Sequence, residues 1–307
     1  FEREQVDYIV LETGLGGRYD ATNIVSRPQV CVITAIGKDH EAYLGNTIPA
    51  IAGEKAGIIK PGVPLVCDGN NPQALKVFQK AAKEKGCRCR IIAKNAFEIQ
   101  KISSNNIAFS ALNAYYVDTV WTIRGCGQYQ PMNAVLAIEV MKLIAPKEGF
   151  MVDEESWRTA LADVLWPGRM EEVRPGVILD GAHNKEAMIE AAATIKGQAP
   201  SGGGIIVIYA AAADKNYERA LSYLARQLPE ARFVTTGLSD SRSADAEQLA
   251  AVIRSHAECE VTKKTTVPEA VRYALALKGP EDVVYCLGSL YLVGEVKALL
   301  EEERLDA

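Results

Sequence analysis

Long apolar runs and a surplus of positive charge are both missing from this sequence of 307 residues. No run approaches the roughly 20 consecutive apolar positions that a membrane-spanning helix needs, so we expect no such helix and no membrane partner. Lysine and arginine total 34 against 39 aspartates and glutamates, which gives a formal net charge of −5. Because nucleic-acid binding depends on clustered positive charge, this balance argues against nucleic acid as the main partner.

A cysteine pattern typical of disulfide-bonded proteins is missing as well. The seven cysteines are an odd number, are scattered along the chain and lie mostly within apolar runs. This pattern is typical of reduced, buried thiols, and we therefore expect a cytoplasmic protein. Cys87 and Cys89 are too close together for an ordinary zinc knuckle, and no histidine follows nearby.

The composition is that of a globular protein. Apolar residues make up 48% and charged residues 24% of the chain, which excludes a disordered tail or a collagen-like fibre. At roughly 150 residues per domain, the length predicts about two domains.

Short apolar runs alternate with helical periodicity in the first part of the chain. We predict buried strands at Val6–Leu11, Val30–Ile36, Val63–Cys67 and Cys89–Ala93, and helices at Thr47–Ile59 and Pro72–Lys85. Strand–helix alternation predicts a parallel sheet with right-handed crossovers. Residues 97–124 alternate with a period of two and predict antiparallel hairpins, which two helices at 131–144 and 153–164 follow.

A turn at Trp166-Pro167-Gly168-Arg169 is the best candidate for a domain boundary. The alternation of strands and helices begins again after it, with strands predicted at Val177–Leu179, Ile205–Tyr209, Phe233–Thr235 and Val283–Leu287. We therefore predict an α/β protein with one domain at residues 1–166 and a second, smaller α/β domain at residues 167–307.

A glycine loop follows the first predicted strand, in the run LETGLGGRYDATN at residues 11–23. Glycine lets the backbone approach a ligand closely, and ligands of open α/β sheets bind at the carboxyl ends of strands. Glu12 places a carboxylate at this strand end. A simple turn with a surface acid is the alternative, but Arg18, Asp20 and Asn23 favour a functional loop.

His40 follows the second predicted strand, in the run IGKDH. Adjacent parallel strands would bring Glu12 and His40 to the same edge of the sheet. One carboxylate and one imidazole, with positions left for phosphate oxygens, suit a divalent cation. On spacing alone, a polar loop without a metal remains the alternative.

Three further candidates have ordinary structural interpretations. Lys55 follows Glu54 between small residues of a predicted helix, where an exposed ion pair is the simpler interpretation. Asn133 lies near a predicted helix start and could cap the helix or bond a base. Ser289, in the run GSLYLVG, is typical of a helix N-cap.

The most specific cluster combines WPGRM at residues 166–170 with VILDGAHN at residues 177–184. Asp180 ends a predicted strand, and His183 and Asn184 open a helix whose free N–H groups favour anions. Arg169 is the residue type that forms bidentate contacts with phosphate. Capping is the alternative role for Asp180 and Asn184.

In order along the chain, the runs ETGLGGRYDATN, DHEAYLGNTIPAIAGEKAGIIK, PGRMEE, LDGAHN and GSLYLVGEV resemble folylpolyglutamate synthase/dihydrofolate synthase, a branch of the Mur ligase superfamily. The resemblance implies a mostly parallel-sheet ATPase domain, followed by a smaller Rossmann-like glutamate-ligase domain. It also implies an ATP-dependent ligase that adds L-glutamate to tetrahydrofolate, to dihydropteroate or to both, through an acyl phosphate.

The resemblance carries over to individual residues. Glu12 and His40 match the Mg²⁺ ligands of the family, and Lys55 matches a carbamylated lysine that helps to hold a second cation. ATP contacts are matched by Asn133, Arg169 and Asp180. Contacts with the pterin substrate are matched by Tyr19, Asp20 and Ala21. His183 and Ser289 match positions that place the incoming glutamate, and we expect Lys55 and His183 to be catalytic.

One motif of the family does not occur in the sequence. The phosphate-binding loop G-x-x-G-K-[ST], which cradles ATP phosphates, has no match here. In the family this loop precedes the strand that carries Glu12, so we expect Phe1 to mark a truncation and this chain alone to have little or no activity. Two alternatives remain open, a Mur ligase acting on UDP-MurNAc peptides and a non-catalytic binding module derived from a ligase. We expect a monomer with small-molecule partners.

Overall fold

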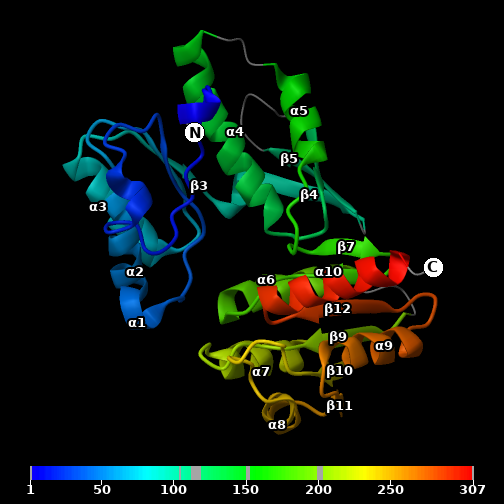
Figure 1. Cartoon of the computed structure of the whole chain (residues 1–307). Helices are drawn as coiled ribbons and strands as arrows, with labels where there is room; N and C mark the ends of the chain where they lie inside the picture. Colours follow the sequence, from blue (N-terminus) through cyan, green and yellow to red (C-terminus); the bar gives the residue numbers. More distant parts are fainter. Residues whose placement is uncertain (1, 104, 112–118, 150–152, 199–202, 306–307) are drawn as a thin grey trace. The chain divides into compact units, whose positions relative to one another are not determined.

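The structure is a computed structural model that describes residues 2–103, 105–111, 119–149, 153–198 and 203–305 (Figure 1). The chain forms two compact units. The first comprises residues 1–97, 111–115 and 132–157, and the second comprises residues 98–110, 116–131 and 158–307. These units differ from the division predicted at residues 166 and 167, because the second unit also takes in residues that precede that turn.

A three-stranded parallel sheet in the order β1-β2-β3 forms the centre of the first unit. Its strands are β1 (Cys31–Ile33), β2 (Leu65–Asp68) and β3 (Cys89–Ile92). The helices of this part of the chain are α1 (Glu41–Leu44), α2 (Ile48–Lys55), α3 (Pro72–Glu84) and α4 (Gln130–Glu148). Single 3₁₀ turns are η1 (Glu2–Glu4), η2 (Ala21–Ile24), η3 (Ala56–Ile58) and η4 (Lys94–Ala96). The predicted parallel sheet and its two crossover helices are confirmed.

Local sequence signals set the starts of these helices. Thr47 caps α2 by accepting a hydrogen bond from the Ala50 N–H. Asn71 caps α3 in the same way, and Pro72 occupies its first turn, where no N–H is needed. Phe78, on the inner face of α3, is fully buried in the core that the helix shares with the sheet.

The strand predicted at Val6–Leu11 is wrong. This segment has no regular secondary structure, all of its residues are exposed, and Val10 is 95% exposed. A strand is stable only when a neighbouring strand satisfies its backbone, and none of the strands in the described residues pairs with this segment. Glu12 is therefore not held at the end of a strand.

The hairpins predicted at residues 97–124 are confirmed as a three-stranded sheet in the order β4-β5-β6. Its strands are β4 (Phe97–Ile102), β5 (Asn106–Ala111) and β6 (Val120–Arg124). β5 and β6 are antiparallel, and Phe109 and Trp121 are paired across them with both side chains buried.

A six-stranded sheet in the order β11-β10-β9-β12-β8-β7 dominates the second unit. Its strands are β7 (Glu171–Arg174), β8 (Val177–Leu179), β9 (Ile205–Tyr209), β10 (Arg232–Thr235), β11 (Glu260–Lys263) and β12 (Val283–Leu287). β7 is antiparallel to β8, and the other neighbours are parallel. Four of these strands were predicted from the sequence, whereas β7 and β11 were not.

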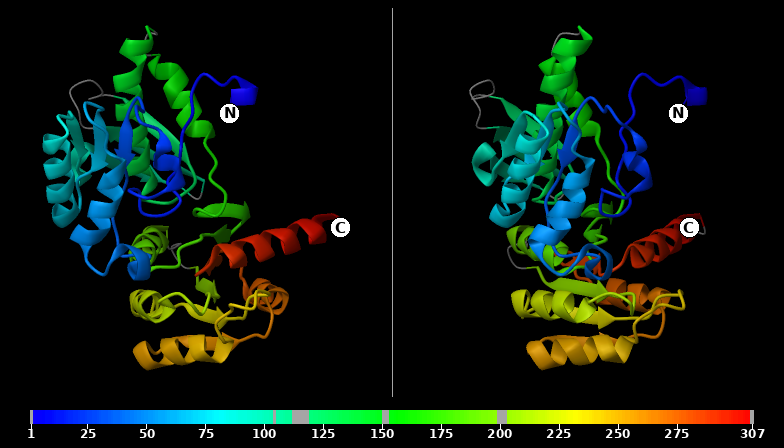
Figure 2. Two further views of the ribbon diagram at one scale, coloured as in Figure 1. Left: turned by 60° about the vertical axis from the view of Figure 1, so that its left-hand side comes forward. Right: turned by 90° about the vertical axis from the view of Figure 1, so that its left-hand side faces the viewer.

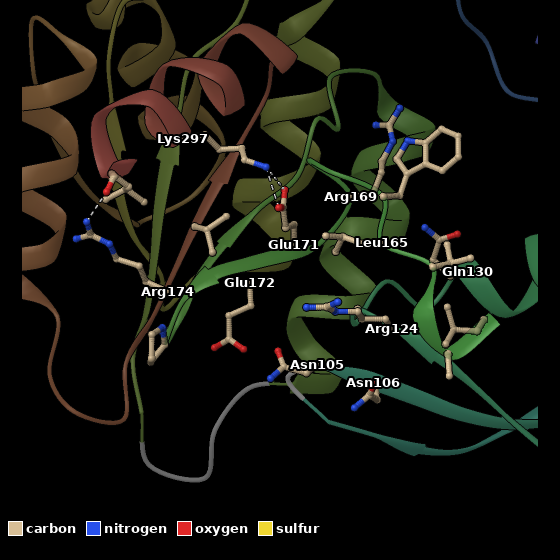
Figure 3. A pocket seen from close by; sticks show the side chains of 18 of the residues that line it. Asn105, Asn106, Arg124, Gln130, Leu165, Arg169, Glu171, Glu172, Arg174 and Lys297 are labelled. Carbon is tan, nitrogen blue, oxygen red and sulfur yellow. Dashed lines mark hydrogen bonds and ion pairs between the residues drawn. The ribbon is translucent and has the colours of Figure 1, made fainter. Parts of the chain in front are cut away.

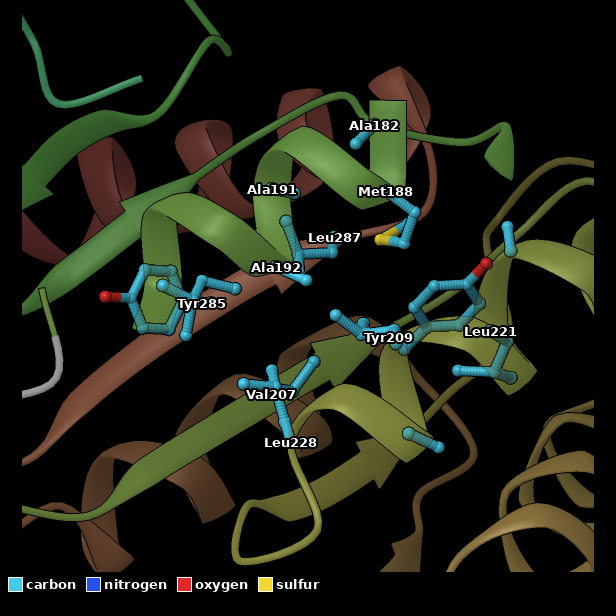
Figure 4. Packing of buried hydrophobic residues seen from close by; sticks show 14 of the residues in the cluster. Ala182, Met188, Ala191, Ala192, Val207, Tyr209, Leu221, Leu228, Tyr285 and Leu287 are labelled. Atoms are coloured by element: carbon cyan, nitrogen blue, oxygen red, sulfur yellow. The ribbon is translucent and has the colours of Figure 1, made fainter. Parts of the chain in front are cut away.

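Helices cover both faces of this sheet (Figures 1 and 2). The helices of this part of the chain are α5 (Glu154–Asp163), α6 (Lys185–Gln198), α7 (Tyr217–Gln227), α8 (Ala246–His256), α9 (Val267–Leu277) and α10 (Leu290–Leu305). α6, α7 and α8 pack on one face, where Tyr209, Tyr285 and Met188 are fully buried (Figure 4). α9 and α10 pack on the other face.

The last strand, β12, lies between β8 and β9, so the chain reverses its direction across the sheet. The loops that follow β8 and β12 are therefore neighbours. Such a switch point is where open α/β sheets bind ligands. No helix in the described part of the chain is long and apolar enough to cross a membrane.

Candidate functional site

The glycine loop of the first unit lies against α2. The Arg18 N–H donates to the Glu54 carbonyl at 2.9 Å, and the Arg18 and Glu54 side chains form an ion pair at 3.3 Å. A Cβ at Gly17 would lie 2.9 Å from the Glu54 carbonyl oxygen, and a Cβ at Gly57 would lie 2.4 Å from the Arg18 Cα. Both glycines are needed for this contact, so the run at residues 14–18 and the GEKAG run at residues 53–57 form one packed element.

The Asp20 carboxylate forms hydrogen bonds within its own loop. Its carboxylate accepts hydrogen bonds from the Leu15 N–H at 2.8 Å, the Thr22 N–H at 3.0 Å and the Thr22 hydroxyl at 2.6 Å. These donors, the Thr22 hydroxyl foremost, lower the pKa of Asp20 to about 2. Ala21 begins η2, for which Asp20 is the N-cap, while the Tyr19 side chain is 90% exposed. Tyr19 is therefore the predicted substrate contact in this loop whose side chain is most accessible to a ligand.

Glu12 and His40, the two predicted metal ligands, are both exposed. His40 has a left-handed backbone with φ of 52° at the start of α1, and its Nε2 atom lies 4.0 Å from an Asp39 carboxylate oxygen. Across the described residues, no group of three or more His, Cys, Asp or Glu side chains could hold a metal ion. Magnesium seldom uses an all-protein cage and takes phosphate and water oxygens instead. The chemistry of one carboxylate and one imidazole is compatible with such a cation.

Lys55 and Asn133 lie on helices of the first unit. Lys55 is the last residue of α2 and is half-buried. Asn133 lies in the first turn of α4, which begins at Gln130, and its side chain is exposed. The interpretation of Asn133 as a helix cap is therefore wrong, because the helix begins three residues earlier than position 133.

The turns after β8 and β12 are joined by backbone hydrogen bonds. The Asp180 N–H donates to the Cys286 carbonyl at 3.0 Å, and the Gly288 N–H donates to the Ala182 carbonyl at 2.8 Å. Gly288 has φ of 108°, and a Cβ there would lie 2.3 Å from the Ala210 carbonyl oxygen. Only glycine fits this position, so the switch point has a fixed backbone.

Asp180 is the buried acid of this edge, with 3% exposure. One of its oxygens, Oδ1, accepts from the Ala182 N–H at 2.7 Å, and Oδ2 accepts from the Met170 N–H at 2.8 Å. Burial raises the pKa of Asp180, because it disfavours the charged form, while these two N–H donors and the Arg169 charge oppose that rise. The capping alternative is wrong for Asp180, because its two backbone donors, Ala182 and Met170, lie outside any helix and α6 begins only at Lys185.

Arg169 lies on the turn before β7. The Gly181 N–H donates to the Gly168 carbonyl at 2.8 Å, which ties this turn to the loop after β8. A Cβ at Gly181 would lie 2.3 Å from Cδ2 of Leu290 and 3.2 Å from Nη1 of Arg169, so the glycine leaves room for both side chains. Among the described residues, the half-buried guanidinium forms no hydrogen bond or ion pair, which leaves its donors available to a ligand.

His183, Asn184 and Ser289 lie on the two joined turns. His183 Nδ1 is 2.9 Å from the Gly181 carbonyl oxygen. Asn184 accepts a hydrogen bond from the Ala187 N–H at 2.8 Å and so caps α6. Ser289 is 5% exposed and accepts from the Tyr291 N–H at 3.1 Å at the start of α10. The capping alternatives for Asn184 and Ser289 are confirmed.

A groove of about 990 Å³ in the second unit borders the Arg169 turn (Figure 3). One wall comes from β7 and α10, where Glu171 and Lys297 form an ion pair at 2.8 Å. The opposite wall includes Asn105, Asn106 and Arg124. Charges of both signs line the groove, so its lining does not select one class of ligand.

Sequence reasoning missed Tyr129, whose hydroxyl donates to Oδ2 of Asp180 at 3.2 Å. The residue lies just before α4, far from Asp180 in the sequence, and no local pattern relates the two. The only local signal near Tyr129 is the run QPMNA that follows it, and this run points to Asn133.

Comparisons with known protein families and with individual proteins point to the same group of enzymes. Residues 168–290 match the family described as Mur ligase, glutamate ligase domain. The chain is 32% identical over 312 residues to a dihydrofolate synthase/folylpolyglutamate synthase of Bacillus subtilis, an alignment that covers 98% of this chain and 69% of that protein. A second enzyme of the same name, from Escherichia coli, is 29% identical, with 99% of this chain and 67% of that protein covered.

Solved structures agree with these relatives. A Mycobacterium tuberculosis folylpolyglutamate synthase complexed with ADP and AMPPCP superposes with a TM-score of 0.82 at 26% identity, covering 97% of this chain and 70% of that one. Escherichia coli FolC in complex with DHPP and ADP superposes with a TM-score of 0.81 at 28% identity, covering 99% of this chain and 68% of that one.

Proposed function

Since the chain belongs to the folylpolyglutamate synthase/dihydrofolate synthase family, we propose that it functions in an ATP-dependent ligase. This ligase joins L-glutamate to a folate, to dihydropteroate or to both. The observation that carries the proposal is the alignment with the Bacillus subtilis enzyme over 98% of this chain. The likeness to structures that bind ADP supports adenine nucleotide as the phosphoryl donor.

The chemistry follows from the low reactivity of a carboxylate. Its oxygen is a poor leaving group, so the γ-phosphoryl group of ATP is first transferred to it, which releases ADP and forms an acyl phosphate. The glutamate amine then attacks the carbonyl carbon, and phosphate leaves from the tetrahedral intermediate as the amine loses its proton. Water must be excluded while the acyl phosphate exists, because water would hydrolyse it.

In this proposal Arg169, Asp180 and Asn133 contact ATP. Arg169 has free donors, and its positive charge offsets charge on the transferring phosphoryl group. Asp180 is an acceptor on a fixed backbone, which suits recognition of a hydrogen-bond donor of the nucleotide. Asn133 has an exposed amide on α4.

The remaining predicted residues contact the pterin and glutamate substrates in this proposal. Tyr19 offers an exposed ring to the pterin, while Asp20 and Ala21 hold the loop that carries it. His183 and Ser289 lie on the joined turns of the second unit, where the incoming glutamate is placed in this proposal. His183, with Lys55, keeps the predicted catalytic role. We further infer a cytoplasmic monomer whose partners are small molecules.

Glu12 and His40 would hold Mg²⁺, and a carbamylated Lys55 would help to hold a second cation. A divalent cation supplies charge that offsets the phosphates of ATP. The test compares His40→Ala with His40→Asn, since asparagine tolerates the left-handed backbone of position 40. We expect both variants to lose the gain in ATP affinity that Mg²⁺ gives, while His40→Asn keeps the wild-type melting temperature. An unchanged Mg²⁺ effect in both variants would remove His40 from the proposed metal site.

Binding tests the proposal more directly than turnover does, because the sequence contains no G-x-x-G-K-[ST] run. Titration calorimetry with ATP, ADP, dihydropteroate, tetrahydrofolate and a UDP-MurNAc peptide separates the candidate functions. We expect adenine nucleotide and at least one pterin compound to bind, and the two pterin compounds distinguish the two synthase activities. Absence of nucleotide binding, or a preference for the UDP-linked peptide, would overturn the proposal.

The alternatives fit the findings less well. The relatives are named for folate substrates and not for peptidoglycan precursors. A non-catalytic module has no need of the free donors of Arg169 beside the buried carboxylate of Asp180.

A further inference from the structure

Residues 125–130 belong to the second unit and contact the rest of it at several points. The Cys126 thiol contacts the Met170 carbonyl at 3.4 Å, and the Gln128 N–H donates to the Thr194 hydroxyl at 3.2 Å. Tyr129 follows directly and places its hydroxyl 3.2 Å from Oδ2 of Asp180. The phenol therefore reaches Asp180 from a segment that is held at two other points.

The position of the Tyr129 ring depends on a glycine. A Cβ at Gly127 would lie 2.9 Å from two carbons of the Tyr129 ring and 3.2 Å from its hydroxyl oxygen. Any larger residue at position 127 would push the ring away. The run GCGQY at residues 125–129 thus leaves room for the Tyr129 ring in its observed position.

The hydrogen bonds of Asp180 leave one acceptor position open. A carboxylate has about four lone-pair sites. The Met170 N–H and the Tyr129 hydroxyl occupy both sites on Oδ2, and the Ala182 N–H occupies one site on Oδ1. No other donor among the described residues contacts Oδ1, so its second site remains for a ligand.

A ligand group that binds this site must be a hydrogen-bond donor. In ATP the donors are the ribose hydroxyls and the 6-amino group, whereas the phosphates are acceptors and carry negative charge. Burial of Asp180 makes the bond strong only if the carboxylate keeps its charge and its orientation. The Tyr129 hydroxyl and the Arg169 charge both favour the ionised form and so lower the pKa of Asp180 against the effect of burial.

We propose that Tyr129 is a positioning residue for nucleotide binding, which fixes the Asp180 carboxylate so that its one open acceptor site faces a donor group of the nucleotide. The inference rests on the proposed contact between Asp180 and ATP. Tyr129 acts through Asp180 and does not itself touch the nucleotide.

The test is a titration of ADP, 2′,3′-dideoxy-ADP and inosine diphosphate into the wild-type chain and the Tyr129→Phe variant. A lost hydrogen bond of about 0.5–1.5 kcal/mol corresponds to a fall in ADP affinity of about 2- to 12-fold. We expect that fall for ADP, and no fall for the analogue that lacks the donor bound by Asp180. A merely structural effect would weaken all three nucleotides equally.

Two further variants control the measurement. Tyr209→Phe also removes a buried tyrosine hydroxyl in the second unit, but that hydroxyl has no hydrogen-bond partner within the described residues, so ADP affinity should not change. Gly127→Ala keeps the tyrosine and displaces its ring, so it should reproduce the effect of Tyr129→Phe even if that variant folds poorly.

The outcomes separate the two proposals. If the wild-type chain binds no adenine nucleotide, the proposed function fails and this inference fails with it. If the wild-type chain binds ADP more tightly than one analogue, and Tyr129→Phe and Gly127→Ala keep the same affinities, only the inference on Tyr129 is overturned.

Discussion

At the scale of single residues, the role of Asp20 follows from its hydrogen bonds. The Thr22 hydroxyl and two backbone N–H groups hold the pKa of its carboxyl at about 2, below the ordinary value of 3.8. Because the folded-state pKa is lowered, Asp20 stabilises the fold fully above the ordinary pKa. That contribution is lost as the pH falls from about 4 through about 2.

We therefore expect Asp20→Asn to destabilise the chain at pH 5 and to matter progressively less as the pH falls to 2. The measurement is urea unfolding of both chains across this range, together with an NMR titration of the Asp20 carboxyl. A titration midpoint near 4, or a difference in stability that does not change with pH, would contradict the assignment.

A second residue-scale prediction concerns Gly288 at the switch point. Its φ of 108° is unfavourable for any other residue, and a Cβ there would lie 2.3 Å from the Ala210 carbonyl oxygen, which leaves no room for a side chain. Gly288→Ala should lower the free energy of unfolding by about 2 kcal/mol or more. The matched control is Gly294→Ala in α10, where a Cβ meets nothing within 4 Å. Helix propensity predicts a gain of up to about 1 kcal/mol there, and equal losses in both variants would show that the close approach at Gly288 is not the cause.

At the scale of elements, the contact between the glycine loop and α2 is the clearest case. A Cβ at Gly57, in η3, would overlap the Arg18 backbone, whereas a Cβ at Gly53, in the preceding helix α2, meets nothing within 4 Å. We expect Gly57→Ala to cost about 1–3 kcal/mol of stability and to expose the loop at residues 14–23 to proteolysis. Gly53→Ala should leave both properties near wild-type. Rapid cleavage of the loop in both variants would indicate that the contact does not hold it.

The elements also mark where sequence patterns succeed and fail. Parallel strands, crossover helices and hairpins were predictable because their periodicity and capping residues are local, as in α3 with Asn71 and Pro72. Val6–Leu11 has the same apolar pattern as a buried strand and forms none, because pairing depends on a neighbour that a local pattern cannot specify. β7 was missed for a related reason, since its charged sequence EEVR pairs only at the edge of the sheet.

At the scale of the whole molecule, the two compact units have separate cores. The core of the first contains Phe78 and Leu65, and that of the second contains Tyr209 and Tyr285. We expect scanning calorimetry to resolve two unfolding transitions, because two-state unfolding holds for single domains and not across several. Gly57→Ala should shift only one transition and Gly288→Ala only the other. A single transition that both variants shift equally would contradict independent cores.

Much of the site was predictable in the same local sense. Arg169 and Asp180 were identified from short runs, and the structure brings them to one edge of the second sheet, where the Asp180 pKa reflects the charge of Arg169. The structure does not bring Glu12 and His40 into a group of three or more ligands within its described residues. The local roles of Asn184 and Ser289 as caps were also predictable from their positions at helix starts.

The sequence by itself determined the α/β class, the order of the motifs and the membership of the family, because consecutive residues carry these signals. Only the tertiary structure decided that Asp180 is buried with one open acceptor site and that Tyr129 is the residue that holds it. The physical reason is that these contacts join residues far apart in the chain. Packing of the sheet and the docking of residues 125–130 place them, and no local periodicity encodes that placement.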